Sequence, residues 1–337
     1  MLYLAIGGFV FNQTLSRKAA SRGMNEMSDA DALLGREGLN KKIAQRKPWE
    51  RFMSRIIGDA SGLTAFYDKP YYPLFLEGLK WYFENNPEIV TINSPAGERL
   101  HADMFLSEKH SDVWFICLHG YTSAPRDMSG PAKIYRDGWG CNVLLPYLRG
   151  HSLSESKYAS MGWLDRLDIV SWIEYLCREY HNPKIIIHGI SMGGAVAMMT
   201  LGENLPVNVV CAIADCGYSS FWEEYVLQAK TAFRLPVFPF MYALNTVIRI
   251  RLGFSMKEAS CVEQVKKSKT PALFIHGDKD TVVPFWMLDK VYDACASDKE
   301  KLVVSGAEHG EAHYDEQLYY RTVKEFIERY APELKNI

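Results

Sequence analysis

Short apolar runs recur along the chain from residue 113 onward. They are Val113–Leu118, Asn142–Leu145, Lys184–Ile187, Val209–Ala214, Ala272–Ile275 and Leu302–Val304. Continuous apolar runs of this length are typical of strands buried on both faces. Amphipathic stretches with helical spacing lie between them, for example Trp163–Tyr180 and Ala195–Leu201. This alternation predicts a mostly parallel, doubly wound α/β sheet.

The pattern before the first of these runs is different. Residues 12–88 show apolar positions at helical spacing, including Trp49, Phe52 and Ile56, and later Phe75 and Leu79. This spacing predicts a helical N-terminal extension over residues 1–88. Two alternating segments follow, Glu88–Asn93 and Glu98–Leu106, and the turn Ser94-Pro95-Ala96-Gly97 between them predicts a hairpin.

One connection is too long for a simple crossover. More than fifty residues separate Asp215 from Thr270, and aromatic residues crowd the first half. We expect a helical cap inserted at about residues 217–268. Its aromatics either line an acyl pocket or form the cap's own core, and the core is favoured because helical apolar stripes usually pack. These residues are Phe221, Trp222, Tyr225, Phe233, Phe238, Phe240 and Tyr242.

The chain begins with the apolar segment MLYLAIGGFVF, which is 11 residues long. A membrane-spanning helix needs roughly 20. Arg17, Lys18 and Arg22 follow the segment, and neither a basic region before it nor a small-residue cleavage site after it is present. We expect a buried or interfacial helix start, with the remnant of a membrane anchor as the alternative. Contact with a membrane through the N-terminus therefore stays open.

Charge and cysteine content narrow the class of partners and the compartment. The formal net charge is −2, and its 38 basic and 40 acidic residues are spread along the sequence, which argues against nucleic acid as a partner. An odd number of cysteines without metal-type spacing favours a reduced compartment, and we expect the cytoplasm. The seven are Cys117, Cys141, Cys177, Cys211, Cys216, Cys261 and Cys295.

The segment from Lys184 to Ala195 reads KIIIHGISMGGA and carries the candidate nucleophile. It places a G-x-S-x-G pattern, with Ser191 at its centre, between a predicted strand and a predicted helix. The glycines flanking such a serine leave room for a tight, strained turn that exposes its hydroxyl. Amides at the start of the following helix can stabilise developing negative charge. Ser191 is therefore predicted to be a nucleophile.

A serine hydroxyl needs a base and an acidic residue that orients the base. Two later loops supply candidates. ALFIHGDKDTVVP, from Ala272, places Asp278 and Asp280 directly after a buried strand, and LVVSGAEHG, from Leu302, places His309 after the next one. His313 is the alternative base, but a loop position suits His309 better. Asp215 is a third candidate acid, although we expect it to cap the turn after its strand.

With these segments in view, the chain resembles the α/β-hydrolase superfamily, in particular its bacterial serine aminopeptidase-like and carboxylesterase-like branch. The resemblance covers roughly residues 88–330. It rests on His119-Gly120, Arg149-Gly150-His151-Ser152, Gly189 to Gly193, His276 to Asp280 with Val283-Pro284, and Glu308-His309-Gly310.

The resemblance implies further site residues. Its spacing before Val283-Pro284 favours Asp280 over Asp278 as the acid, and the backbone amides of Tyr121 and Met192 would form an oxyanion hole. It implies no cofactor and no metal, and it would make residues 89–337 a hydrolase domain. We expect His119, His151 and His188 to be structural.

These observations predict a serine hydrolase that cleaves small carboxylic esters by way of an acyl-enzyme. An amidase or aminopeptidase would use the same three residues. A thioesterase would need a basic site for a large polar leaving group, and we expect no such cluster in the cap. A binding module that lost catalysis is disfavoured by the intact set of Ser191, Asp280 and His309. The oligomeric state is left undetermined.

Overall fold

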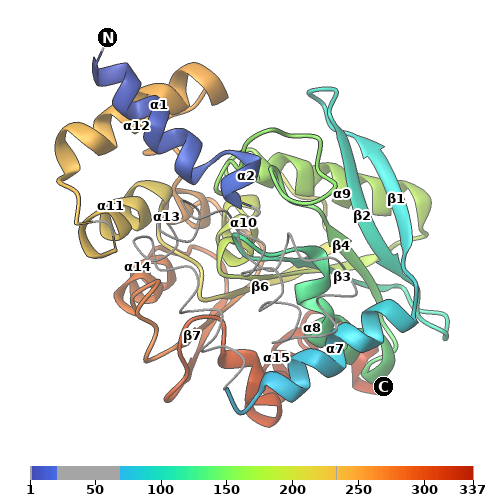
Figure 1. Cartoon of the computed structure of the whole chain (residues 1–337). Helices are drawn as coiled ribbons and strands as arrows, with labels where there is room; N and C mark the ends of the chain where they lie inside the picture. The colour runs from blue at the N-terminus through green and yellow to red at the C-terminus, as the bar shows by residue number, and fades with distance from the viewer. Residues whose placement is uncertain (1, 21–68, 233, 337) are drawn as a thin grey trace.

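A single eight-stranded sheet forms the centre of the molecule (Figure 1). The computed structural model describes residues 2–20, 69–232 and 234–336. The strand order is β1-β2-β4-β3-β5-β6-β7-β8. β1 to β2 and β2 to β4 pair antiparallel, and every other neighbouring pair is parallel. The strands are β1 Glu88–Asn93, β2 Arg99–Phe105, β3 Val113–Leu118, β4 Asn142–Pro146, β5 Lys184–Ile190, β6 Val209–Asp215, β7 Ala272–Gly277 and β8 Lys299–Val304.

The predicted hairpin and doubly wound sheet are both confirmed. β3 shows why its apolar run is continuous: Trp114, Ile116 and Leu118 face one apolar cluster, and Phe115 and Cys117 face the other. Alternate side chains of a strand point to opposite faces of the sheet. Because both faces are covered, the side chains on each face are buried. β8 begins three residues earlier than predicted. It lies at the edge of the sheet, where its charged residues Lys299, Glu300 and Lys301 remain partly exposed.

Helices cover the two faces of the sheet. Apolar residues of α9, α10, α13 and α14 share one cluster, and those of α7, α8 and α15 share the other. The predicted extension thus includes α7, which packs on the sheet; Trp49, Phe52 and Ile56 lie outside the described residues. The helices are α1 Leu2–Thr14, α2 Arg17–Ala20, α7 Tyr72–Glu84, α8 Ser129–Lys133, α9 Asp165–Glu179, α10 Met192–Thr200, α11 Phe221–Thr231, α12 Val237–Leu252, α13 Cys261–Val265, α14 Trp286–Ala294 and α15 Glu316–Ile327.

The N-terminal helix α1 packs along α12 at one end of the molecule (Figure 1). Gly7 allows close contact, since a Cβ there would lie 2.3 Å from the carbonyl oxygen of Ala243. The chain then continues toward the loop before α9, where the amide of Ala159 donates to Leu15 O at 2.8 Å. Among the described residues, no helix is long and apolar enough to cross a membrane.

The aromatic residues of the insertion include both buried and exposed side chains. Phe221 is fully buried, as expected for a cap core. Phe238 and Tyr242 are instead 72% and 44% exposed, so these two do not belong to a cap core, which was expected for most of the aromatics. Helical spacing alone does not say which face of a helix meets a neighbour, and α1 and α11 cover only part of α12. Phe233 lies outside the described residues.

Candidate active site

Ser191 lies at the sharp turn between β5 and α10. Its φ of 59° and ψ of −119° are strained for a residue with a side chain. The neighbouring glycines explain how the turn fits. A Cβ on Gly189 would lie 2.0 Å from Gly193 O, and one on Gly193 would lie 1.9 Å from Leu118 O. Only glycine fits at these two positions, and Ser191 lies half-buried at the carboxyl end of β5.

The structure brings the three residues of the predicted set together. His309 Nε2 lies 2.8 Å from Ser191 Oγ, and His309 Nδ1 lies 2.7 Å from Asp280 Oδ2. Because an ionised carboxylate only accepts hydrogen bonds, Nδ1 carries the proton and Nε2 accepts from the serine hydroxyl. Each residue comes from the carboxyl end of a different strand, β5, β7 or β8, where side chains of parallel strands converge.

Asp280 is held in a single orientation by several donors. Its Oδ1 accepts from the amides of Val282 and Val283 at 2.9 and 2.8 Å. Burial acts to raise the pKa of its carboxyl, but hydrogen bonds from His276 and His309 outweigh burial and hold the pKa well below its usual range. The side chain of Asp280 is fully buried. The carboxylate is therefore ionised and fixed at neutral pH.

His276 is a site residue that sequence reasoning missed, although it lies within the motif that suggested Asp280. Its Nε2 donates to Val283 O at 2.8 Å and lies 3.2 Å from Asp280 Oδ2. Burial lowers the pKa of this imidazole, but the hydrogen bond with Asp280 and the Val283 carbonyl reverse that effect, so the pKa is raised. Asp280 therefore lies between two histidines. The sequence signal that could have identified this contact is the spacing: a histidine at the end of a strand, four residues before the candidate acid.

Asp215, the third candidate acid, forms no hydrogen bond with His309, and it does not cap the following turn as expected. Its side chain is fully buried at the end of β6. Burial raises the pKa of its carboxyl to about 6, and the nearby charge of His276 opposes the rise. The expectation failed because the carboxyl of Asp215 is fully buried near His276 and does not reach the amides of the following turn.

The loop after β3 passes directly beside the serine. A Cβ on Gly120 would lie 3.5 Å from Ser191 Cβ. Tyr121 follows Gly120, and Met192 is the first residue of α10, so its amide has no partner within that helix. Tyr121 also donates its hydroxyl proton to Thr14 O, which ties this loop to the N-terminal helix. The predicted oxyanion amides are thus carried by the two segments that flank Ser191.

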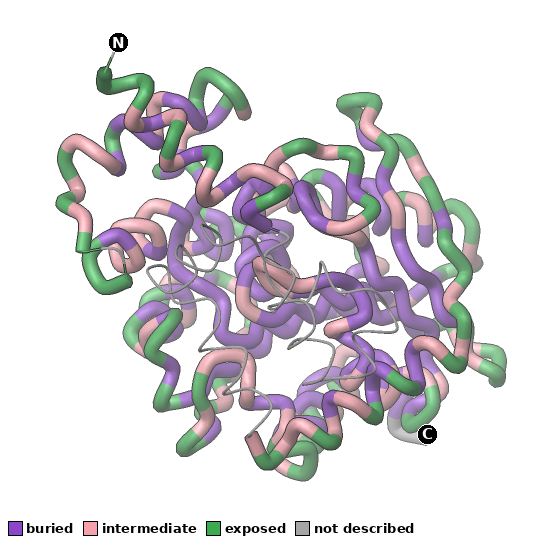
Figure 2. Tube along the Cα trace, in the orientation of Figure 1, coloured by how far each residue is buried: buried purple, intermediate pink, exposed green. Residues whose placement is uncertain are grey.

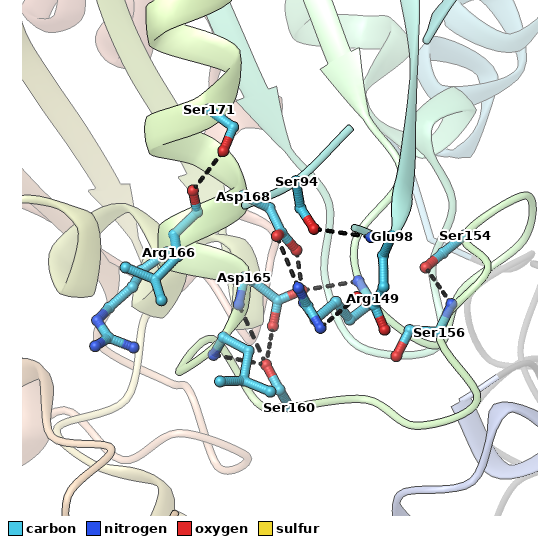
Figure 3. A network of polar contacts seen from close by, with 12 residues as sticks. Ser94, Glu98, Arg149, Ser154, Ser156, Ser160, Asp165, Arg166, Asp168 and Ser171 are labelled. Atoms are coloured by element: carbon cyan, nitrogen blue, oxygen red, sulfur yellow. Dashed lines mark hydrogen bonds and ion pairs between the residues drawn. The ribbon is translucent and has the colours of Figure 1, made fainter. Parts of the chain in front are cut away.

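A buried polar network supports the loop after β4 (Figure 3). Arg149 forms two hydrogen bonds with Asp168 of α9, at 2.6 and 2.8 Å, and an ion pair with Glu98 before β2. Its amide donates to Asp165 Oδ1 at 2.8 Å. The guanidinium of Arg149 therefore joins the hairpin to α9. It also fixes the loop after β4, whose His151 ring packs against the ring of Tyr121.

His188 and His119 have structural partners, as expected, and His313 is also packed away from Ser191. His188 lies between the hydroxyls of Tyr135 and Tyr319, each 2.9 Å away, and burial lowers its pKa to about 3. His119 Nε2 accepts from the amide of Leu148 at 3.2 Å. His313, the alternative base, is buried in a short turn of 3-10 helix, where it packs on Tyr314 and Tyr319.

Asp278, the alternative acid, is exposed and accepts from Gly306 N at 2.7 Å. It braces the turn that leads to His309 through Ser305 and Gly306 and forms no hydrogen bond with that histidine. Cys216 lies nearer: its Sγ is within 4.8 Å of the ligand atoms of Asp280 and His309. A metal ion there would require a thiolate, and burial raises the pKa of the Cys216 thiol well above its usual value.

Glu224 of α11 is a second residue that the sequence did not single out. It is buried, its Oε1 accepts from Gln228 at 2.8 Å, and its Oε2 has no hydrogen-bond partner. Burial raises the pKa of the carboxyl to about 7, and the charge of His309 opposes the rise. Gln228 also donates to Val282 O at 3.0 Å, beside Asp280. The insertion therefore places an acidic side chain in the electrostatic neighbourhood of the triad.

Comparison with known proteins agrees with this architecture. Residues 139–333 match the sequence profile of the prolyl oligopeptidase family. The uncharacterized protein YqkD of Bacillus subtilis is 27% identical over 63% of this chain and 70% of its own length. The α/β hydrolase domain-containing protein WAV2 of Arabidopsis thaliana is 24% identical over 82% and 92%. The Pyrococcus furiosus esterase Pf2001 superposes with a TM-score of 0.59 at 22% identity, covering 78% of this chain and 96% of the esterase.

The buried Glu224 predicts a specific pH dependence of stability. Its pKa rises from 4.5 in the unfolded chain to about 7 in the folded protein, so the folded form binds more protons between these values. Stability therefore falls as the pH rises from about 4.5 to 7. Glu224→Gln removes this loss. We expect its melting temperature to exceed that of the wild type by a margin that grows from pH 4 to pH 8, corresponding to roughly 1–3 kcal/mol.

The neighbouring Glu223→Gln is the control. Glu223 pairs with Lys290 and its pKa is lowered, so this variant loses stability above pH 4.5. Thermal unfolding followed by circular dichroism across this pH range measures both variants. A melting difference for Glu224→Gln that does not change with pH contradicts the assignment.

Proposed function

Because the chain belongs to the prolyl oligopeptidase family of serine hydrolases, we propose that it cleaves carboxylic esters through a triad of Ser191, His309 and Asp280. The supporting observation is the continuous hydrogen-bonded path from the strained serine through His309 to the buried carboxylate. A base within 2.8 Å of a serine hydroxyl, itself oriented by an acid, is the arrangement that activates a weak nucleophile.

The reaction starts when Ser191 Oγ attacks the ester carbonyl carbon and its proton passes to His309 Nε2. The carbonyl oxygen becomes negative and is stabilised by the amides of Tyr121 and Met192. The bond to the alcohol oxygen then breaks, and His309 returns the proton to that oxygen. Water attacks the acyl-serine by the same route, losing a proton to His309, and the products are the carboxylic acid and free Ser191.

Asp280 stays ionised throughout this cycle. Its low pKa keeps the negative charge available when His309 becomes an imidazolium, and the hydrogen bond to Nδ1 preserves the tautomer that leaves Nε2 ready to accept. Because the carboxylate is fixed by four donors before the reaction, little reorganisation accompanies the proton transfer.

Amide cleavage is the second candidate. The family model that matches residues 139–333 is that of a peptidase family, and this favours a peptide or amide substrate. The same triad would protonate an amine leaving group. The fold likeness to an esterase supports the ester instead. Matched ester and amide substrates with one acyl group decide between them: a higher kcat/KM on the amide, after allowance for the uncatalysed rates, would replace the ester proposal.

Loss of the nucleophile is the first prediction for this site. Ser191→Ala abolishes labelling by a fluorophosphonate probe and lowers turnover of p-nitrophenyl esters by about 10⁴-fold or more, because the acyl-enzyme can no longer form. Ser123→Ala, on the loop beside Gly120, is the control and keeps its labelling. Wild-type protein that is folded but takes up no probe contradicts the proposed triad.

The two candidate acids give opposite results. Asp280→Asn lowers kcat by roughly 10³–10⁴-fold, since an amide at this position cannot hold the charge and tautomer of His309. Asp278→Asn changes kcat less than about threefold, because that exposed side chain contacts only the turn at Ser305 and Gly306. Steady-state kinetics on one p-nitrophenyl ester measure both. The assignment fails when the two variants lose activity equally.

His276 acts through Asp280 rather than on the substrate, so it is a positioning residue. Truncation in His276→Ala removes a hydrogen bond from the carboxylate and lowers kcat about tenfold, with KM unchanged. His276→Gln keeps a donor near Nε2 and recovers most of the rate. Kinetic measurement of both variants tests the role; equal losses in the two, or a change confined to KM, would point to packing alone.

A further inference from the structure

The outer surface of α1 and α12 exposes an unusual number of large apolar side chains. Figure 2 shows exposed stretches alternating with partly and fully buried ones along the helices at the N-terminal end of the molecule. On α1, Leu2 and Phe9 are 77% and 62% exposed, and on α12, Phe238 and Ile250 are 72% and 70% exposed. We call the surface formed by these residues the cap face; it comprises Leu2, Tyr3, Leu4, Phe9, Phe238, Tyr242 and Ile250.

The two helices form this surface as one unit. Gly7 of α1 packs directly on the backbone of Ala243, and Arg251 of α12 donates to Asn12 Oδ1 at 2.9 Å. The guanidinium of Arg251 also stacks over the ring of Phe11, 4.8 Å from its centroid. The exposed apolar residues of both helices therefore belong to a packed helix pair whose inner contacts are already satisfied.

Charge around the cap face is mostly positive. Residues 2–20 and 225–257 contain seven basic and no acidic side chains, although the whole chain has a net charge of −2, and the exposed Glu258 follows directly. The seven are Arg17, Lys18, Lys230, Arg234, Arg249, Arg251 and Lys257. Arg249 is exposed next to Ile250, and Lys257 lies over the ring of Tyr242, 5.9 Å from its centroid.

We infer that the cap face docks on the surface of an anionic lipid bilayer. Large apolar side chains enter the boundary between headgroups and acyl chains, while arginine and lysine around them bind lipid phosphates. An excess of basic over acidic side chains around the apolar residues matches a negatively charged surface. A protein partner of ordinary composition would not require this excess of positive charge. The helices lie along the surface and do not cross it, in agreement with their length and polarity.

Docking in this orientation brings the candidate active site close to the bilayer. α11 follows Ser220 and joins the cap face to the Asp280 loop through the hydrogen bond between Gln228 and Val282 O. The hydroxyl of Tyr121 reaches back to Thr14 at the end of α1. Both helices of the cap face are thus connected to loops that flank the triad. A substrate with an apolar acyl chain can then be taken from the lipid phase.

Vesicle flotation of the full chain tests the inference without any substrate. Vesicles of phosphatidylcholine with 30% phosphatidylglycerol are compared with phosphatidylcholine alone, at about 0.05 M and 0.5 M salt. We expect binding to the anionic vesicles at low salt, and a loss of at least about tenfold at high salt or without the anionic lipid. Ser191→Ala should bind equally, which separates this result from the proposed chemistry.

Two double variants remove the two contributions. Phe9→Ser with Ile250→Ser removes apolar insertion, and Arg249→Gln with Lys257→Gln removes charge; each should weaken vesicle binding about tenfold or more. These side chains are exposed, so the fold should be kept, as thermal unfolding would verify. The controls are Val207→Ser, which is 94% exposed before β6, and Lys109→Gln, exposed before β3.

Three results would overturn the inference. The first is wild-type protein that does not float with anionic vesicles at low salt. The second is binding that the control variants weaken as much as the cap-face variants do. The third is a dimer, detected by light scattering, that the Phe9→Ser and Ile250→Ser variant dissociates; this would assign the cap face to a second copy of the chain.

Discussion

The close backbone contact between the β5–α10 turn and the end of β3 is the constraint on which the rest of the site depends. Gly193 approaches Leu118 O so closely that no side chain fits, and Gly189 approaches Gly193 in the same way. This contact forces Ser191 into its strained conformation and aligns the start of α10 with the loop after β3. The candidate nucleophile and both predicted oxyanion amides are therefore positioned by one packing constraint.

Burial and the number of hydrogen-bond donors set the pKa values of the carboxyl groups in and around the triad. Asp280 stays ionised in a buried position because two histidines and two amides donate to it, whereas Asp215 and Glu224 lack that number of donors and their pKa values rise. Unpaired charge is costly in a low-dielectric interior, so each carboxyl adopts the charge state that its donors can support. Three acids close to one another thereby have clearly different pKa values.

The insertion after β6 gives the molecule a second surface with its own chemistry. Its outer helix α12 and the N-terminal helix α1 gather exposed apolar and basic side chains at one end. Its inner helix α11 contacts the loop that holds Asp280. Under the two proposals, this insertion links the surface that docks on the bilayer to the site where the ester is cleaved.

The sequence alone predicted the succession of strands and helices along the chain, the hairpin, and the set of Ser191, Asp280 and His309 that we propose as the triad, because strand periodicity and the glycines of a tight turn are local properties. Only the tertiary structure decided that His276 contacts Asp280, that Asp215 lies buried beneath the site, and which face of α12 stays exposed. These outcomes depend on which segments, distant in sequence, come to lie side by side, and burial then sets both the pKa of each acid and the surface left to water.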